Sequence, residues 1–403
     1  MPGIPETPRR RVAVTAASCI SPLGADESQT VASLRAAKDF VTPVTLFDVS
    51  TTRCKTAGQV PETSFERADA RHPAAKKLSR VSRMMLATLG DAVQQCPAFL
   101  PERIIMGTTS GGMSLGEAFY RAFAGNKSLR EARHWVREYI PQQAVLDAIA
   151  PFGWKAPYQI ISNACASGTN SIGSAFQLVR AGLCQSVACG GYDAISELVF
   201  HGFDCLQAST PEKCRPFDAN RTGLVLGEGA AVLFLEEWDY AVQQGRNILA
   251  EIIGYGSSTD NHHLTQPNPD GNGPRRAMQA ALLSANIQPE QIDYINAHGT
   301  ATPYNDASEG RAILDVCPTS KVSSTKSMMG HSLGAAGSIE AAFCICALRN
   351  GFVPANIHFQ NCDETLPLDI VANTSLETNP NIILSNSFGF GGSNASLILK
   401  RVA

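Results

Sequence analysis

The run NACASG around Cys165 carries a side chain suited to acyl-group chemistry. It lies between an apolar run that ends at Ile161 and a helical pattern that begins near Asn170. A cysteine in this place lies near a helix N-terminus, where backbone N–H groups and the helix dipole favour the nucleophilic thiolate. Considered alone, Cys165 would be better explained as a small buried residue, because the chain contains 12 cysteines.

Two histidines occupy comparable positions later in the chain. His298 lies in the run NAHGTATP after an apolar strand pattern, and His331 lies in KSMMGHSLGAAG before a Gly/Ala-rich helical pattern. A structural hydrogen bond would explain either histidine alone. Because active sites of α/β proteins form where strands end, two histidines and a cysteine at three strand-to-helix turns together predict one site.

A fourth segment, NSFGFGGSN from Asn386, places three glycines around two phenylalanines. A flexible backbone with bulky apolar side chains is typical of a gate or an oxyanion-hole turn, and a tight hairpin with packed aromatic rings is the alternative. The run is not a dinucleotide-binding fingerprint, because Asn394 stands where that fingerprint has a glycine.

The elements that must position these residues alternate between strands and helices. Apolar residues at helical spacing predict helices over 170–181, 273–285 and 337–349. Short apolar runs predict strands over 11–15, 103–106, 158–161, 186–189, 231–235, 250–254, 293–296, 381–384 and 395–399. This alternation indicates an α/β architecture with largely buried sheets. The polar stretch 257–274 is long for a structureless loop, so we expect it to be functional, and it is also the best candidate for a boundary between halves.

Composition limits the class of protein. The chain has 403 residues, a net charge of −3, 44% apolar residues and 17% charged residues, which indicates a globular fold rather than disorder. The slightly acidic balance disfavours general nucleic-acid binding. No C-x-x-C spacing, signal peptide or long apolar stretch occurs, so we expect no metal site, no membrane segment and a cytoplasmic location.

A competing motif is GHSLG at 330–334, which matches the nucleophile elbow of serine hydrolases and acyltransferases. In those hydrolases an acid and then a histidine follow the serine. After Ser332 the only histidine is His358, and Glu340 is the only promising acid before it. Because Asp363 and Asp369 follow His358 instead of preceding it, the order of residues does not match, and a serine acyltransferase or hydrolase is only the second hypothesis.

Together, these segments resemble the β-ketoacyl-acyl-carrier-protein synthases, the elongating condensing enzymes of type II fatty acid and polyketide synthesis. The matching runs are NACASG, HGTATPYND, KSMMGHSLGAAG, NSFGFGGSN, CRPFDANRTGLVLGEGA and TDNHHLT, which span nearly the whole chain in the order of the family. The resemblance implies a thiolase-like α/β fold with layers of helix, sheet, helix, sheet and helix. It also implies two related halves, expected here at 1–255 and 256–403.

The resemblance implies a decarboxylative condensation of an acyl chain with a malonyl group. Cys165 would take the acyl chain as a thioester. His298 and His331 would hydrogen-bond the malonyl thioester oxygen during loss of CO₂. Lys326 would organise the two histidines electrostatically, and Glu340 would be its partner.

Further roles follow from the same resemblance. Backbone N–H groups of Cys165 and Phe390 would form the oxyanion hole, and the Phe390 ring would be a gate. Thr300 and Thr302 would hydrogen-bond the pantetheine arm. Two substrate-binding positions depart from the family: Asn163 stands where Thr or Ser is more frequent, and Ser110 where a bulkier apolar residue is common. The preferred chain length therefore stays open. The segment 206–214 resembles specialised branches such as aryl-polyene synthases.

The implied partner is an acyl carrier protein, which delivers both substrates, and no cofactor is implied. An acidic carrier needs a local basic patch. The first choice is Lys76, Lys77, Arg80 and Arg83, and the second is Arg121, Lys127, Arg130 and Arg133, although a solvated helix face explains either set equally well. We expect a homodimer, with a heterodimer containing a chain-length-factor-like subunit as the alternative. A third hypothesis is a partner subunit that is inactive alone, which the presence of Cys165 disfavours.

Overall fold

The computed structural model describes residues 9–72, 75–125, 133, 135–136 and 138–402. Its main feature is a mixed sheet of 11 strands. From one edge to the other these are β12 (Asp369–Ile370), β10 (Lys321–Ser323), β9 (Tyr294–Asn296), β14 (Ile382–Gly389), β15 (Ser393–Lys400), β8 (Ala250–Thr259), β1 (Val12–Ile20), β7 (Gly229–Glu237), β6 (Ser186–Asp193), β4 (Arg103–Gly107) and β5 (Tyr158–Ile161). Two antiparallel pairs of short strands lie apart from it: β2 (Thr42–Pro43) with β3 (Thr56–Ala57), and β11 (Phe352–Val353) with β13 (Leu376–Glu377).

The strand order repeats within this sheet. Five strands from the N-terminal part of the chain, called the first set, lie in the order β5-β4-β6-β7-β1. Five strands from the C-terminal part, called the second set, lie in the equivalent order β10-β9-β14-β15-β8, and β12 is added outside β10. The two sets meet where Val12 to Val14 of β1 pair with the start of β8. Two segments of the chain thus share one topology, although no internal repeat is visible in the sequence.

This equivalence makes β8 the first strand of the second set. The expected boundary at residue 255 falls inside that strand, so we propose that the second half begins with β8. The polar stretch 257–274 then lies within the second half, from the end of β8 to the start of α10 (Asn272–Ala285).

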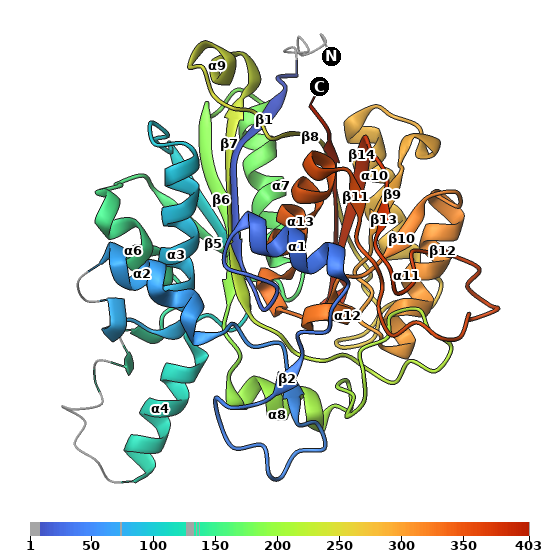
Figure 1. Cartoon of the computed structure of the whole chain (residues 1–403), viewed down its shortest axis with the longest axis horizontal. Coiled ribbons are helices and arrows are strands. Elements are labelled where there is room, and N and C mark those ends of the chain that lie inside the picture. Colours follow the sequence, from blue (N-terminus) through green and yellow to red (C-terminus); the bar gives the residue numbers. More distant parts are fainter. Residues whose placement is uncertain (1–8, 73–74, 126–132, 134, 137, 403) are drawn as a thin grey trace.

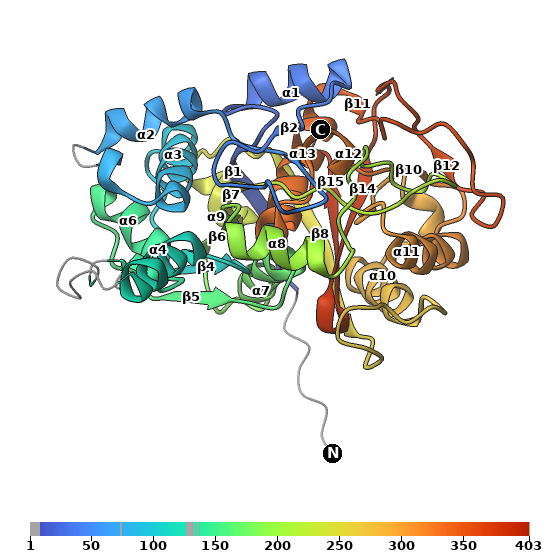
Figure 2. The ribbon, with the colours of Figure 1, turned by 90° about the horizontal axis from the view of Figure 1, so that it is seen from below.

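Helices cover both sets of strands and fill the space between them, which produces five layers (Figures 1 and 2). The first set is covered on its outer face by α3 (Arg80–Gln95) and α6 (Gln143–Ile149), and the second by α10 and α11 (Pro303–Val316). Between the sets lie α7 (Ser167–Arg180) and α13 (Ala336–Asn350), which contact each other. The remaining described helices include α1 (Glu27–Ala36), α2 (Glu66–Arg71), α4 (Met113–Ala124), α8 (Glu197–Cys205), α9 (Trp238–Gln243) and α12 (Lys326–Met329).

The central helices form the best buried part of the core. Every residue of α13 from Ala336 to Leu348 is buried. Such a helix, apolar on most of its circumference, is stable only when other elements enclose it. Ile172 and Phe176 of α7 pack in the same cluster as Ile345 and Leu348 of α13. The N-termini of these two helices also approach closely, since a Cβ at Gly337 would lie 2.0 Å from the Thr169 hydroxyl oxygen, and both lead into the site described below.

The predicted strands are all present, and several are longer than predicted. β6 continues from Cys189 to Asp193, β8 from Gly254 to Thr259 and β14 from Leu384 to Gly389. These extensions are rich in Gly, Ser and Asn, which have low strand propensity, and pairing with neighbouring strands keeps them extended. The site lies at these ends.

Candidate active site

Cys165 lies on a strained turn between β5 and α7. Ala164, the preceding residue, has a φ of +55°, which L-residues other than Asn and Asp rarely adopt. The Ser167 hydroxyl holds the turn, since it accepts from the Asn163 N–H at 2.9 Å and donates to the Ala164 carbonyl at 2.6 Å. The turn places the Cys165 sulfur at a cavity while keeping it only 6% exposed.

Two backbone N–H groups converge on this sulfur, those of Phe390 and of Cys165 itself. The backbone at Gly389 approaches closely, because a Cβ there would lie 3.0 Å from the Cys165 nitrogen. This geometry is that expected of an oxyanion hole, in which two donors point to the place where negative charge develops.

Burial raises the pKa of Cys165 to about 12, against the effect of the Lys326 charge and the two backbone N–H groups, which lower it. The Asp193 carboxylate raises it further. The backbone N–H groups thus favour the thiolate as expected, but burial has the larger effect on the pKa in the substrate-free protein. The loss of hydration outweighs the local dipoles, and the resting sulfur is a thiol.

His298 follows β9, and the Glu309 carboxylate holds its backbone. Glu309 lies in α11 and accepts the N–H groups of His298 and Gly299, both at 2.8 Å. Burial raises the pKa of Glu309 to about 7, while these N–H groups lower it. Glu309 therefore positions the loop that carries His298.

His331 follows α12 on an extended segment that lies beside 225–227. Its N–H donates to the Val225 carbonyl at 2.7 Å, and its carbonyl accepts from the Gly227 N–H at 2.8 Å. Gly330 has a φ of +76° and packs on the Leu226 backbone, so no Cβ fits there. The run that begins at Cys214 thus serves partly to hold this histidine.

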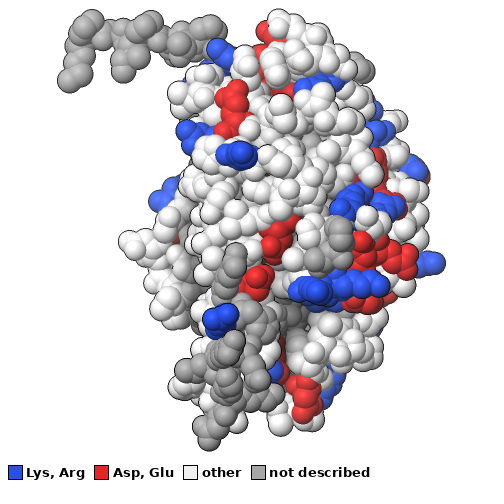
Figure 3. All heavy atoms as spheres, turned by 90° about the vertical axis from the view of Figure 1, so that its left-hand side faces the viewer, with Lys and Arg blue, Asp and Glu red and all other residues white. Residues whose placement is uncertain are grey.

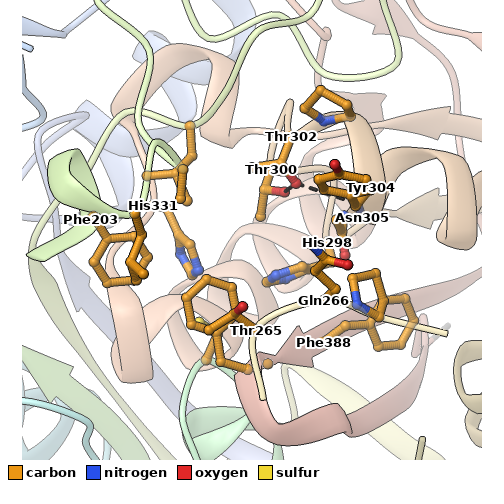
Figure 4. Close-up of a pocket in the computed structure, with 18 of the residues that line it drawn as sticks. Phe203, Thr265, Gln266, His298, Thr300, Thr302, Tyr304, Asn305, His331 and Phe388 are labelled. Atoms are coloured by element: carbon orange, nitrogen blue, oxygen red, sulfur yellow. Dashed lines mark hydrogen bonds between the residues drawn. The ribbon is translucent and has the colours of Figure 1, made fainter. Parts of the chain in front are cut away.

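The two imidazole rings meet edge to face, with centroids 5.2 Å apart (Figure 4). Both are at most 2% exposed. Nδ1 of His298 and both ring nitrogens of His331 have no hydrogen-bond partner among the described residues. Since buried polar atoms are normally paired, these nitrogens are available to a substrate oxygen. Burial lowers the pKa of both histidines well below 6.5, and the Lys326 charge lowers both further, so both are neutral near pH 7.

Lys326 and Glu340 form a fully buried ion pair. The Nζ and Oε1 atoms are 2.5 Å apart, and the side chains are 1% and 2% exposed. Burial raises the pKa of Glu340, and the Lys326 charge lowers it. The pair joins α12 to α13, which places a positive charge near Cys165, His298 and His331, as predicted from the family resemblance.

The predicted nucleophile and both histidines line one cavity of about 220 Å³. Cys165, His298 and His331 all line it, as do Thr300 and Thr302, whose hydroxyls are 2.9 Å apart (Figure 4). The 260–271 segment contributes Asp260, Thr265, Gln266 and Pro267 to the wall, which agrees with the functional role expected for this stretch. The ring of Phe390 stacks on Phe203, with centroids 5.5 Å apart, and closes one side of the cavity.

Three predicted positions lie outside this cavity lining. The Ser110 hydroxyl donates to Asp193 at 2.9 Å, and the Asn163 amide donates to Ser393 at 3.1 Å. Ser332, the alternative nucleophile, is fully buried and does not line the cavity. The turn around Ser332 therefore does not present a nucleophile, which counts against the serine-enzyme hypothesis.

Sequence reasoning did not single out Asp193, which ends β6 and whose carboxylate accepts hydrogen bonds from two separate segments near the site. An acidic residue at the end of a strand of small residues, GGYD, was the only available signal.

Within the described residues, no group of three or more His, Cys, Asp or Glu side chains is arranged to hold a metal ion. In the same part of the chain, no helix is long and apolar enough to cross a bilayer.

Comparison with known proteins agrees with this geometry. Residues 9–241 match the family model described as "Beta-ketoacyl synthase, N-terminal domain", and residues 249–360 match "Beta-ketoacyl synthase, C-terminal domain". The chain belongs to the β-ketoacyl synthase family. As a β-ketoacyl synthase, it is an acyltransferase, and the family predicted from the sequence is confirmed.

Relatives of this β-ketoacyl synthase match over nearly their whole length. The 3-oxoacyl-[acyl-carrier-protein] synthase 2 of Staphylococcus aureus (strain COL) is 35% identical over 409 residues, which cover 97% of this chain and 98% of the relative. The enzyme of the same name from Synechocystis sp. is 34% identical over 410 residues, with 98% of each chain covered. The solved structure of "The ishigamide ketosynthase/chain length factor" has a TM-score of 0.92 at 33% identity and covers 98% of this chain and 100% of that chain. The predicted thiolase-like fold is therefore confirmed.

Proposed function

We propose that the protein joins an acyl chain held on Cys165 to a malonyl group carried by an acyl carrier protein, with release of CO₂. The observation that carries this proposal is the single cavity lined by Cys165, His298 and His331, with unpaired imidazole nitrogens inside it. The two curated relatives are named for the product class of this reaction, a 3-oxoacyl carrier thioester. Fatty acid and polyketide or aryl-polyene synthesis are the settings that the resemblance implies.

In the first step, the Cys165 sulfur attacks the carbonyl of an acyl–carrier thioester. The carbonyl oxygen becomes an oxyanion, which the backbone N–H groups of Cys165 and Phe390 stabilise. Collapse breaks the bond to the carrier sulfur, and the thiol proton of Cys165 ends on that sulfur. The products are acyl-Cys165 and the free carrier thiol.

In the second step, a malonyl thioester enters the vacated space. The bond from its methylene carbon to the carboxylate breaks, CO₂ leaves, and the electron pair moves into the thioester as an enolate. Neutral His298 and His331 donate hydrogen bonds to the enolate oxygen. The enolate carbon attacks the acyl-Cys165 carbonyl, the C–S bond breaks, and the released thiolate takes up one proton. The reaction uses only these side chains and carrier-borne substrates, so no cofactor is part of the proposal.

The remaining cavity residues bind and control access in this proposal. Thr300 and Thr302 line the cavity and bind the pantetheine arm. Phe390 must move from its stacked position on Phe203 before a long acyl chain can enter, and Gly391 and Gly392 beside it have φ values of +78° and +76°. In this proposal, the space beyond the Phe390 ring determines which length of acyl chain the enzyme accepts.

A condensation assay with two variants tests this function. Cys165→Ala should abolish formation of 3-oxoacyl carrier, whereas Ser332→Ala should retain turnover. A serine enzyme would give the opposite result, and it would also be inactivated by a serine-directed phosphonate. Normal condensation by folded Cys165→Ala would refute the proposal.

The carrier-docking proposal narrows to Lys76 and Lys77, which are exposed. Arg80 instead pairs with the buried Glu228 at 2.5 Å, and Arg83 pairs with Glu62 and Asp69 at 2.5 and 3.1 Å. Figure 3 shows basic and acidic side chains interspersed on the side that carries α2, α4 and α6. Charge reversal of both lysines should raise the KM for the carrier and weaken its dependence on salt, whereas an unchanged KM would reject this patch.

The structure describes only two residues of the second basic set, Arg121 and Arg133. Arg121 pairs with Glu197, and Arg133 is exposed. Lys127 and Arg130 lie outside the described residues. This set remains the second choice for docking.

A second copy of the chain is the proposed partner at the free edge of β5. Tyr158 on this strand is 42% exposed, and α4 of the same half exposes Tyr120 and Phe123 at 70% and 57%. An unpaired strand edge beside apolar side chains is typical of an interface. The mass of the purified protein in solution, measured by light scattering, distinguishes a homodimer from a monomer that needs a chain-length-factor-like partner.

A cytoplasmic location completes the proposal, in accord with cysteines that are all free.

A further inference from the structure

Asp193 is a fully buried carboxylate at the end of β6 that the proposed chemistry does not use. It is 0% exposed. Its Oδ1 accepts the Thr108 and Ser110 hydroxyls at 2.7 and 2.9 Å and the N–H groups of Ser110 and Gly111 at 2.8 and 2.9 Å. Its Oδ2 accepts the N–H groups of Thr109 and Gly334 at 2.9 and 2.6 Å. Six donors thus surround this carboxylate, and none of the ion pairs found among the described residues includes it.

These donors come from both halves of the protein. Thr108 to Gly111 form the turn after β4 in the first half, and Gly334 lies in the short 3₁₀ helix Leu333–Ala335 of the second half. The joint is tight, because a Cβ at Gly334 would lie 2.6 Å from the Thr109 nitrogen and 2.7 Å from Asp193 Oδ2. A side chain on Gly334 would therefore push the two segments apart.

Each segment leads directly to a reacting group. On one side, the Thr109 hydroxyl donates to the Ala164 carbonyl at 3.0 Å, and Ala164 is the residue with positive φ that precedes Cys165. On the other side, Gly334 follows His331 by three residues, through Leu333 with a φ of +54°. One carboxylate thus connects the nucleophile turn to the segment that carries a histidine of the enolate site.

We propose that Asp193 is a positioning residue that sets the distance between Cys165 and His331, so that the enolate carbon reaches the acyl carbonyl before a proton does. The inference rests on the proposed function, because it concerns the step between decarboxylation and bond formation. Loss of CO₂ requires the histidine pair, whereas condensation also requires the correct position of acyl-Cys165 relative to that pair. Misplacement by about 1 Å can cost on the order of 100-fold in a rate that depends on alignment.

The ratio of 3-oxoacyl carrier formed to CO₂ released tests this role. Asp193→Asn keeps the size of the side chain but replaces one acceptor oxygen with an NH₂ group that faces N–H donors. In this variant the ratio should fall by about tenfold, because enolate formed out of register is protonated instead of acylated. The ratio is unaffected by the fraction of molecules that are folded, so a merely structural role would leave it at the wild-type value.

Asp218→Asn is the matched control. Asp218 is also 0% exposed and accepts backbone N–H groups, but its donors Asn220, Gln360 and Asn361 do not belong to the turns that carry Cys165 and His331. Its ratio should equal that of wild type. An unchanged ratio in Asp193→Asn, or an equal fall in Asp218→Asn, would overturn the proposal.

If Asp193→Asn does not fold, the same ratio measured in Thr109 variants tests the inference. Thr109→Val removes the hydrogen bond to the Ala164 carbonyl and should lower the ratio, whereas Thr109→Ser retains the hydroxyl and should preserve it. Equal ratios in both variants would overturn the inference. A wild-type protein that releases neither CO₂ nor product would instead refute the proposed function itself.

Discussion

The rings of His298 and His331 meet edge to face at 85°, with centroids 5.2 Å apart, although the two residues come from different loops. Backbone hydrogen bonds hold each loop, through Glu309 for His298 and through Val225 and Gly227 for His331. The rings are therefore fixed before any substrate arrives. Preorganised donors of this kind lower the energy of a transition state without reorganisation.

Removal of either imidazole should affect decarboxylation far more than acylation. His298→Ala and His331→Ala should each slow CO₂ release by about 10²–10³-fold, the cost of losing one donor to a developing oxyanion. Acylation of Cys165, followed by intact mass, should continue, because its oxyanion hole is made of backbone N–H groups. Equal loss of both half-reactions would contradict the assigned roles.

The neutral histidines also predict a dependence of stability on pH. Their pKa values in the folded protein lie well below 6.5, so below that pH the unfolded chain binds protons that the folded protein does not. Their contribution is complete above pH 6.5 and is lost as the pH falls, by up to about 1.4 kcal/mol per pH unit for each histidine.

Urea denaturation at two pH values on either side of 6.5 measures this effect. The double variant His298→Gln/His331→Gln should lose less unfolding free energy on acidification than wild type does. Equal losses in the two proteins would show that these histidines titrate normally.

Removal of one partner of the Lys326–Glu340 ion pair should lower the free energy of unfolding more than replacement of both partners does. Glu340→Gln leaves a buried ammonium without its carboxylate and should lower the free energy of unfolding by about 3–5 kcal/mol. Lys326→Met/Glu340→Met should recover part of this loss while condensation remains impaired. A single variant as stable as wild type would contradict the burial described for this pair.

Opening the Phe390 side of the cavity should activate the Cys165 thiol. Burial is the main cause of its pKa of about 12, so Phe390→Ala should admit water and lower that pKa. Each unit of decrease raises the thiolate fraction, and hence alkylation by iodoacetamide at pH 8, by about tenfold. Peptide mapping provides the internal control, since alkylation of the exposed Cys362 should not change. An unaltered Cys165 rate would show that the ring does not control access of water.

Sequence patterns were sufficient for the element types and for the convergence of the predicted reacting residues on one cavity. Cys165, His298 and His331 follow strands in short polar runs, and the ends of strands meet at one edge of a sheet, so their convergence was predictable. The polar stretch 257–274 was expected to be functional because of its length, and part of it lines the cavity.

Long-range placement could not be obtained from local pattern. The ends of β6, β8 and β14 are built from Gly, Ser and Asn, and only pairing with their neighbours makes them strands. Asp193 is recognisable only when the turn after β4 and the segment of Gly334 are seen together. The burial of Cys165, which raises the pKa of its thiol, also depends on packing that the local sequence does not reveal.

The most direct test of the account is the mass of the intact protein after incubation with an acyl–carrier thioester, followed by peptide mapping. The account predicts one added acyl group per chain, located on Cys165, and its discharge as 3-oxoacyl carrier when malonyl carrier is added. An acyl group on Ser332, or an acyl-Cys165 that malonyl carrier does not discharge, would contradict it.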